Sequence, residues 1–494
     1  MKKTLALLIC LLMLAPSVIS CSDSIPESIE TQSESVPPED TTMEDTTMED
    51  TSPQCTVPED ITLDGETVSI LNFRNGAKSF LVSIEEATGE ILNDAVFNAN
   101  AQLMEEMNFI YEYIDNGGED TMKLFSAVSA GDDIYDIVYG TQCRVAPLVC
   151  DNVFANLNPG AGGYIDMEKP WWYSEYIDES TVDSIHTYFL AGDLSPDIFR
   201  MSSMMLLNMD MLTDIGGNVN DIYETVLNGE WTYDEMYDLV SQVYIDANGD
   251  GERTEADSYG FASYTISDVE HFAIAAGIRG CSRDTDGVPY LSFNNENTVK
   301  FVETLVHFLW NNEGSYYVEG APTLEMLKNN QVLLLNEKFF SLDSLRDSDV
   351  NFTIIPLPKL DTTVEKYTSL SHDCCLVICV PSISGNVETT TAVIEKMAYQ
   401  YYTDVMPQYY DVILKNKYRR DSSDEASQIL DLIHNGLGTD FSYFYNVNLK
   451  AMFTSIRDLI GVSKSTDFAS HYIKNEKSYQ TGLADLIEAL QSVQ

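Results

Sequence analysis

The stretch Gly131-Asp-Asp-Ile-Tyr-Asp-Ile-Val-Tyr-Gly140 decides the fold class of this chain. Its apolar part, residues 134–139, has the length and composition of a buried β-strand that ends at a glycine. Residues 68–73 and 109–114 form two more strand patterns, and residues 91–107 between them carry apolar side chains four apart, which predicts a helix. Strands that alternate with helices predict an α/β architecture. In open α/β sheets, ligand sites lie at such strand ends.

The charge of the chain excludes several classes of partner. Its 494 residues include 27 Lys and Arg against 79 Asp and Glu, for a formal net charge of −52. Phosphate backbones repel such a surface, so nucleic acid is not expected as a partner. Docking to anionic lipid by charge alone is excluded for the same reason. A body of about 430 residues beyond the first 60 is long enough for two lobes.

The N-terminus has the pattern of an export signal. Lys2 and Lys3 precede an apolar run at residues 5–14, which is too short to span a bilayer permanently. The run closes on Val18-Ile-Ser-Cys21, the pattern of a bacterial lipoprotein signal, which predicts cleavage after residue 20 and a lipid on the Cys21 thiol. The alternative is an ordinary secretory peptide with a chance cysteine. We therefore expect an extracytoplasmic protein that a lipid anchors to the bacterial cell membrane.

The segment after Cys21 predicts a spacer. Residues 22–60 consist largely of Ser, Thr, Pro, Asp and Glu without Lys or Arg, and Thr-Thr-Met-Glu-Asp occurs at 41–45 and again at 46–50. Such a composition buries too little apolar surface to offset the entropy of ordering. We expect residues 21–60 to form a disordered acidic linker that holds the folded body away from the membrane.

The remaining cysteines do not form a recognisable metal pattern. They are odd in number, and no His stands at metal-ligand spacing beside them. Cys375 and Cys379 lie in an apolar strand-like run, which favours buried free thiols. A bridge between Cys143 and Cys150 is compatible with the sequence, which does not establish it. The seven positions are Cys55, Cys143, Cys150, Cys281, Cys374, Cys375 and Cys379.

A stretch from Asp246 to Asp257 matches a calcium-binding loop. Oxygen-bearing side chains recur at alternate positions, and Gly251 permits the sharp turn that such a loop needs. Asp257 stands where a longer Glu is usual, so its reach to an ion is shorter. The alternative is an acidic turn without metal. The predicted structural Ca²⁺ ligands are Asp246, Asn248, Asp250, Glu252 through its carbonyl, and Asp257, with Thr254 acting through water.

Several short segments occur in the order of one protein family. They are Gly131 to Val138, Lys169-Pro-Trp-Trp172, Gly229-Glu-Trp-Thr-Tyr-Asp-Glu-Met236, Asp246 to Gly260, Leu345-Arg-Asp347, Ile355-Pro-Leu-Pro-Lys359 and Tyr409 to Asp421. With them the chain resembles the extracellular solute-binding lipoproteins of ABC importers, in particular the maltose-type (family 1) sugar binders. None of the segments is a catalytic signature.

The resemblance implies an α/β fold of the type II periplasmic-binding-protein class, with two lobes and a crossing-strand hinge. A crossing strand is expected at residues 199–207, and the chain is expected to return near residues 351–376. Hinge closure is then absorbed at few positions. The implied boundaries are 1–20 for the signal, 21–60 for the linker, 61–200 with 375–435 for lobe 1, and 201–374 with 436–494 for lobe 2.

Aromatic rings near polar side chains indicate a sugar site in the cleft, because sugar C–H faces stack on rings while hydroxyls need amides, carboxylates or Arg. For each candidate an ordinary packing role is the alternative. Trp171 and Trp172 are candidate ligand-binding residues on these grounds. The resemblance implies the other candidates, which are Arg74, Asn75, Tyr139, Gln142, Arg200, Tyr264, Phe339, Phe340, Arg346, Tyr443 and Tyr445.

The resemblance implies a monomeric binding component that passes a sugar or oligosaccharide to permease subunits. No catalytic residue and no organic cofactor is predicted. One alternative is an exported glycosidase, which would use paired carboxylates and turn over its ligand. Another is a binder of peptides or other non-sugar solutes. Turnover, or a response to peptides, would distinguish these alternatives.

Overall fold

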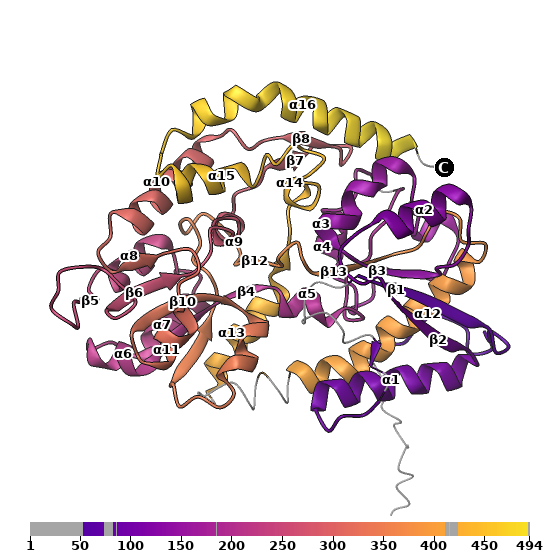
Figure 1. The fold of residues 1–494 in the computed structure, drawn as a ribbon, viewed down its shortest axis with the longest axis horizontal. Helices are drawn as coiled ribbons and strands as arrows, with labels where there is room; N and C mark the ends of the chain where they lie inside the picture. Colours follow the sequence, from indigo (N-terminus) through magenta and orange to yellow (C-terminus); the bar gives the residue numbers. More distant parts are fainter. Residues whose placement is uncertain are drawn as a thin grey trace, which may run out of the picture. The chain divides into compact units, whose positions relative to one another are not determined.

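Two β-sheets organise the part of the chain that the computed structural model describes, namely residues 53–73, 83–84, 86–183, 185–410, 414 and 423–492 (Figure 1). The predicted signal peptide, Cys21 and most of the predicted linker lie outside these residues, as do Arg74 and Asn75. Among the described helices, none is long and apolar enough to cross a membrane.

The first sheet has four strands in the order β13-β3-β1-β2. Strand β3 is the one that the opening sequence pattern predicts. It begins at Ile137 rather than Ile134, which is exposed before the chain enters the sheet, and it does not end at Gly140, because Gly140 and Thr141 still pair with β13. The Asp136 carboxylate accepts hydrogen bonds from the Ser69 amide and hydroxyl, both at 2.7 Å, and so ties β3 to β1. The strands are β1 (Thr67–Asn72), β2 (Ile110–Asp115), β3 (Ile137–Thr141) and the antiparallel β13 (Leu376–Cys379).

Helices flank this sheet. Helix α1 (Ile91–Met107) has the bounds that its four-residue apolar spacing predicts, and it packs against α12 (Val387–Gln400), which comes from much later in the chain. Helix α2 (Met122–Ala130) connects β2 to β3. Figure 1 shows α1 and α12 side by side.

The second sheet has six strands, with β11-β4-β10-β6-β5 in order and β9 also paired with β6. Strand β10 is parallel to β6 and antiparallel to β4. The strands are β4 (Ser203–Asn208), β5 (Tyr244–Ile245), β6 (Ser258–Ser263), β9 (Ser315–Tyr317), β10 (Val332–Lys338) and β11 (Phe352–Ile355). All seven residues of β10 are buried, as expected for a central strand.

Seven helices among the described residues belong with this sheet or lie between its strands. They are α6 (Met209–Asp214), α7 (Val219–Leu227), α8 (Tyr233–Val240), α9 (Asp268–Ala275), α10 (Glu296–Trp310), α11 (Thr323–Lys328) and α13 (Asp424–Asn435). Helix α13 packs on α7 and β11, although the sequence-based boundaries place residues up to 435 with lobe 1. Apart from this observation, the lobe boundaries stay predictions.

The chain passes between the sheets along adjacent segments. It leaves the first sheet through α5 (Pro196–Arg200) into β4, and it returns from β11 through β12 (Ser369–Leu370) into β13. The His372 amide donates to the Met201 carbonyl oxygen at 3.1 Å, so the outgoing and returning segments touch. The predicted strand over 199–207 is wrong in its first residues, because Pro196 opens a helix that includes Phe199 and Arg200.

The C-terminal part of the chain adds the strand β14, which pairs with β12, and further helices. Its long last helix packs against the hairpin β7–β8, against α10 and against the turn at Ala146–Asp151 (Figure 1). The hairpin consists of β7 (Cys281–Arg283) and β8 (Pro289–Leu291). The C-terminal elements are β14 (Leu437–Gly438), α14 (Phe441–Phe444), α15 (Ser455–Arg457) and the last helix, α16 (Phe468–Ser492).

A buried carboxylate joins α12 to the tryptophan pair that sequence analysis placed at the cleft. Glu395 accepts hydrogen bonds from the indole nitrogens of Trp171 and Trp172, each at 3.0 Å, and from the Asp166 amide at 3.2 Å. Both rings are buried, with 0% and 4% of their surface exposed. The predicted cleft contact of these rings therefore does not occur in this structure; they anchor the core beside the first sheet.

We expect Glu395→Ala to lower the free energy of unfolding by about 2–4 kcal/mol, because it leaves two indole N–H groups and one amide without their acceptor. Burial raises the pKa of Glu395 to about 7, so ionisation costs the folded state free energy as the pH rises from 4.5 towards 7. That part of the pH dependence of stability should disappear in the variant. Denaturant titrations from pH 4.5 to 8 measure both effects.

The control is Glu388→Ala, an exposed glutamate on the same helix, which should change stability by less than about 0.5 kcal/mol. Equal losses in the two variants would contradict a specific role of the Glu395 carboxylate.

Candidate functional site

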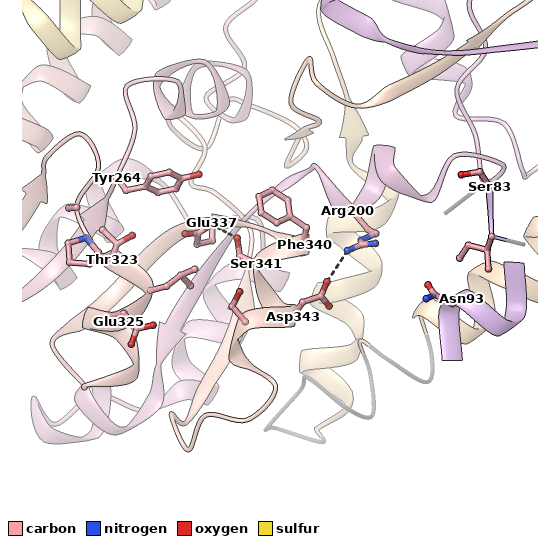
Figure 2. Close-up of a pocket in the computed structure, with 15 residues that line it drawn as sticks. Ser83, Asn93, Arg200, Tyr264, Thr323, Glu325, Glu337, Phe340, Ser341 and Asp343 are labelled. Carbon is pink, nitrogen blue, oxygen red and sulfur yellow. Dashed lines mark hydrogen bonds and ion pairs between the residues drawn. The ribbon is translucent and has the colours of Figure 1, made fainter. Parts of the chain in front are cut away.

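A cavity of about 800 Å³ opens between segments of the first sheet's helical layer and the carboxyl ends of strands in the second sheet (Figure 2). Figure 2 shows Ser83 and Asn93 facing residues of β10 and α11 across the cavity, with Arg200 between them. Its lining residues are Ser83, Ile84, Asn93, Arg200, Tyr264, Ala321, Pro322, Thr323, Leu324, Glu325, Glu337, Phe340, Ser341, Asp343 and Ser344.

The parallel pairing of β6 and β10 brings two of these residues together. Tyr264 comes directly after the last residue of β6, and Glu337 is the penultimate residue of β10. Because parallel neighbours end at the same edge of a sheet, both side chains reach the same cavity. The Gly320 amide donates to the Tyr264 carbonyl oxygen at 2.7 Å and holds the following loop against this edge.

Glu337 is the most buried carboxylate of the lining, with 2% of its surface exposed. It accepts a hydrogen bond from the Ser341 hydroxyl at 2.6 Å, and Ser341 also lines the cavity. Burial raises the pKa of Glu337, against the opposing effects of Lys338 and Ser341. A carboxylate in this position can accept hydrogen bonds from a hydroxyl group of a bound molecule.

A buried ion pair lies behind the Tyr264 ring. Lys338 Nζ is 3.2 Å from Asp268 Oδ1, and the two side chains are 4% and 0% exposed. The same ammonium lies 6.0 Å from the centre of the Tyr264 ring. Burial opposes the lysine charge, but Asp268, Tyr264 and Glu337 together hold the pKa of Lys338 above its usual value. The Lys338 ammonium is therefore within the range of a cation–π interaction with the Tyr264 ring.

Arg200 and Asp343 form a second ion pair, at the cavity surface. Arg200 Nη2 is 2.9 Å from Asp343 Oδ2, and the arginine side chain is 13% exposed against 57% for the aspartate. Arg200 ends α5 on the crossing segment, while Asp343 belongs to the 3₁₀ segment Phe339–Leu345 after β10. The pair places a fork of N–H donors and a carboxylate next to each other at the mouth of the cavity.

Of the sequence-predicted residues, the structure brings Arg200, Tyr264 and Phe340 together at this cavity. Phe339 is buried instead, with its ring centre 4.5 Å from that of Phe199. Arg346 is exposed and pairs with Glu90 at 3.1 Å.

The other described candidates lie in the core. Tyr139 donates to the Leu194 carbonyl oxygen at 3.3 Å, and Gln142 accepts a hydrogen bond from Tyr176. The Tyr443 hydroxyl accepts from the Asp373 amide at 3.2 Å, and the Tyr445 hydroxyl donates to the Ser180 carbonyl oxygen at 2.6 Å. All four side chains are at most 1% exposed, so in this structure they pack rather than line the cavity.

Sequence reasoning missed Asn93, Glu337, Ser341 and Asp343. The sequence does contain a signal for Glu337: polar residues directly follow the apolar run Val332–Leu335, as expected at the end of a buried strand. For Asn93 we find no such signal. It lies on a surface helix, and only the tertiary fold places it opposite β10.

The predicted calcium loop connects β5 to β6, and its turns follow the expected pattern. Asp246 accepts from the Gly249 amide at 2.7 Å and from the Gly251 amide at 2.9 Å, so its carboxylate faces the loop interior. Both glycines have left-handed φ values, 72° and 77°. Asp257 is buried and accepts from the Ala247 amide at 3.1 Å. Strand β6 begins at Ser258, directly after the loop.

Comparison with known proteins gives matches at the level of structure. No protein-family model matches the chain, and no curated protein sequence matches it. A cyclic α-maltosyl-1,6-maltose binding protein from Arthrobacter globiformis aligns with a TM-score of 0.57 at 12% identity, over 84% of this chain and 98% of that one.

Two further solved structures are similar. The galacto-N-biose/lacto-N-biose I-binding protein of an ABC transporter from Bifidobacterium longum has a TM-score of 0.56 at 9% identity, over 86% of this chain and 98% of its own. A cyclo/maltodextrin-binding protein complexed with maltotetraose has a TM-score of 0.53 at 10% identity, over 86% and 96%. The chain therefore has the two-lobed α/β fold of ABC-transporter solute-binding proteins.

Proposed function

We propose that this chain is the extracytoplasmic solute-binding component of an ABC importer and holds a sugar or oligosaccharide in the cavity beside Tyr264. One observation carries the proposal: aromatic rings and hydrogen-bonding side chains from distant segments converge on one open cavity. Tyr264 and Phe340 supply rings, while Arg200, Glu337 and Asp343 supply donors and acceptors.

The cavity suits a carbohydrate in size and chemistry. Its volume of about 800 Å³ lies within the usual range for small-molecule sites. The apolar C–H face of a sugar ring can stack on Tyr264 or Phe340, and its hydroxyls can donate to Glu337 or accept from Arg200. Because a sugar is neutral, it also suffers no repulsion from the acidic surface of the protein.

Residues on opposite sides of the cavity support a mechanism by closure. Ser83 and Asn93 belong to the part of the chain around the first sheet, and Thr323 and Glu337 belong to the second. A ligand that contacts both sides favours the conformation in which they approach each other. In our proposal this closed form is what the permease subunits recognise, the protein acts as a monomer, and no bond is made or broken.

Replacing Tyr264 by Ala should weaken sugar binding tenfold or more, because loss of one stacked ring costs about 1.4 kcal/mol or more. Calorimetry over a panel of mono- and oligosaccharides measures the affinity, and small-angle scattering detects the compaction. The matched control is Tyr290→Ala, an exposed tyrosine in β8 outside the cavity, which should leave the affinity unchanged.

The same panel tests the alternatives. Saturable binding of peptides without a response to carbohydrates would contradict the sugar assignment while leaving a binding protein. Release of new reducing ends from a bound oligosaccharide would instead indicate a glycosidase and contradict both.

We further propose that Cys21 carries a lipid that anchors the protein to the cell membrane, as the lipoprotein-type signal predicts. Cys21→Ala should release the protein from the membrane fraction or block its processing. Fractionation with metabolic lipid labelling measures this. A variant that is still labelled and membrane-bound would contradict the proposal, and Cys55→Ala serves as the control.

We also propose that the loop Asp246–Asp257 holds a structural Ca²⁺ through Asp246, Asn248, Asp250, the Glu252 carbonyl and Asp257. Two features support it: the donors are hard oxygens, which suit Ca²⁺, and the Asp246 carboxylate faces the loop interior.

Chelation should lower the melting temperature, and added Ca²⁺ should restore it by mass action, because an ion that binds only the folded state stabilises it. Asp250→Ala should abolish the response, which differential scanning fluorimetry measures. The control is Asp286→Ala, in another exposed acidic turn, which should retain it. Equal melting temperatures with chelator and with millimolar Ca²⁺ would contradict the site.

A further inference from the structure

Two cysteines that are far apart in the sequence meet beyond the ends of β3 and β13. Cys143 lies in the short helix α3 (Gln142–Val145), which directly follows β3, and Cys374 lies two residues before β13, whose first residue Leu376 pairs with Thr141. Backbone hydrogen bonds hold the two segments together there: the Gln142 amide donates to the Cys375 carbonyl oxygen at 3.0 Å, and the Cys143 amide donates to the Asp373 carbonyl oxygen at 2.9 Å.

The two sulfur atoms face each other. They lie within 4.8 Å of one another, together with a carboxylate oxygen of Asp373, and the Cys143 thiol donates a hydrogen bond to the Cys374 sulfur. Because a disulfide holds its two sulfur atoms about 2 Å apart, rotation of the two side chains is needed to join them.

The pair is accessible to reagents. Both cysteines are half-buried, and Cys143 lines a surface pocket of about 500 Å³ together with Arg144, Pro147 and Leu148. Of the other thiols nearby, Cys375 is buried against Tyr176. Cys150 is exposed, and its sulfur accepts a hydrogen bond from the Asn448 side-chain amide at 3.2 Å.

The surroundings make the two thiols chemically unequal. The hydrogen bond from Cys143 and the neighbouring His372 lower the pKa of Cys374 to about 5, while the same hydrogen bond and burial raise the pKa of Cys143. The charged groups that face the pair are Asp373, which opposes a thiolate, and Arg144 and His372, which favour it. Cys374 is therefore the better nucleophile, whereas the Cys143 thiol keeps its proton.

We propose that Cys143 and Cys374 form a disulfide that joins the end of β3 to the segment returning from the second sheet. The oxidant is a disulfide of a thiol–disulfide exchange partner. The Cys374 thiolate attacks one of its sulfurs and expels a thiolate. Cys143 then loses its proton and attacks Cys374 Sγ in the mixed disulfide, expelling the second thiolate. Two electrons pass from the cysteine pair to the oxidant, which leaves as two thiols.

This bond lies close to the segments through which the chain passes between the two sheets. Cys374 follows His372, whose amide bonds to Met201 on the outgoing segment. The bond therefore fixes one of the two crossing segments to the first sheet and closes a loop of most of the folded chain, which restricts the unfolded state strongly. The proposed bond excludes a bridge from Cys143 to Cys150, with which the sequence alone is also compatible.

The test uses the full mature protein, first reduced and then incubated with oxidised glutathione. Peptide mapping without reductant, after alkylation of the remaining thiols, should identify a peptide pair linked through Cys143 and Cys374, two hydrogen atoms lighter than the reduced pair. The oxidised protein should melt at a higher temperature than the reduced protein. Cys143→Ser and Cys374→Ser should each abolish this difference, whereas the control Cys150→Ser should retain it.

Other outcomes would overturn the proposal. They are a link from Cys143 to Cys150, a stable single glutathione adduct on Cys374, and both thiols remaining open to alkylation after oxidation. Stoichiometric zinc retained by the purified protein and lost in Cys374→Ser would also overturn it, because it would indicate that the thiols and Asp373 ligate a metal instead. If either serine variant fails to fold, mapping of the wild-type protein still decides the linkage.

Discussion

The parallel pairing of β6 with β10 is the constraint on which the cleft depends. It places the ends of two strands from different parts of the sequence at one edge, so Tyr264 and Glu337 reach the same cavity. The buried Lys338–Asp268 pair lies next to this edge, and each charge depends on the other because neither has access to solvent. Loss of either partner would leave an uncompensated charge under the Tyr264 ring. The shape of the site thus depends on groups that do not touch the ligand.

Charge is distributed differently in the cleft and over the whole chain. The chain carries a formal net charge of −52, yet Arg200 pairs with Asp343 at the cleft surface, and Lys338 pairs with Asp268 in the buried region next to it. Local pairing keeps the binding surface suited to hydrogen bonding rather than to ion capture. This arrangement agrees with a neutral, hydroxyl-rich ligand. A strong negative net charge also favours solubility.

The cavity and the crossing segments share residues. Arg200 ends α5 shortly before β4, and the next residue, Met201, accepts a hydrogen bond from the His372 amide of the returning segment. A cross-link at Cys143–Cys374 would act on the same region but outside the cleft. Movement of the two sheets relative to each other would then be confined to few backbone positions, as closure around a ligand requires.

The sequence by itself determined the elements with strong local patterns. The helix at 91–107 and a buried strand in the stretch 134–141 follow from apolar spacing, and the solute-binding fold follows from the order of short segments. Arg200, Tyr264 and Phe340 were expected from the resemblance, and all three line the cavity. Local periodicity is sufficient for the helix and the strand, since it reflects which face of an element is buried.

Tertiary structure alone decided which of the remaining residues face the cavity. The sequence suggests that Trp171 and Trp172 are ligand-stacking rings. In the structure both indole N–H groups donate hydrogen bonds to Glu395, more than two hundred positions later, and the rings are buried in the core. Asn93 joins the site, and Cys143 meets Cys374, through contacts that join distant parts of the chain. A side chain's role depends on its partner in space, and no local pattern encodes a partner that the chain supplies hundreds of residues away.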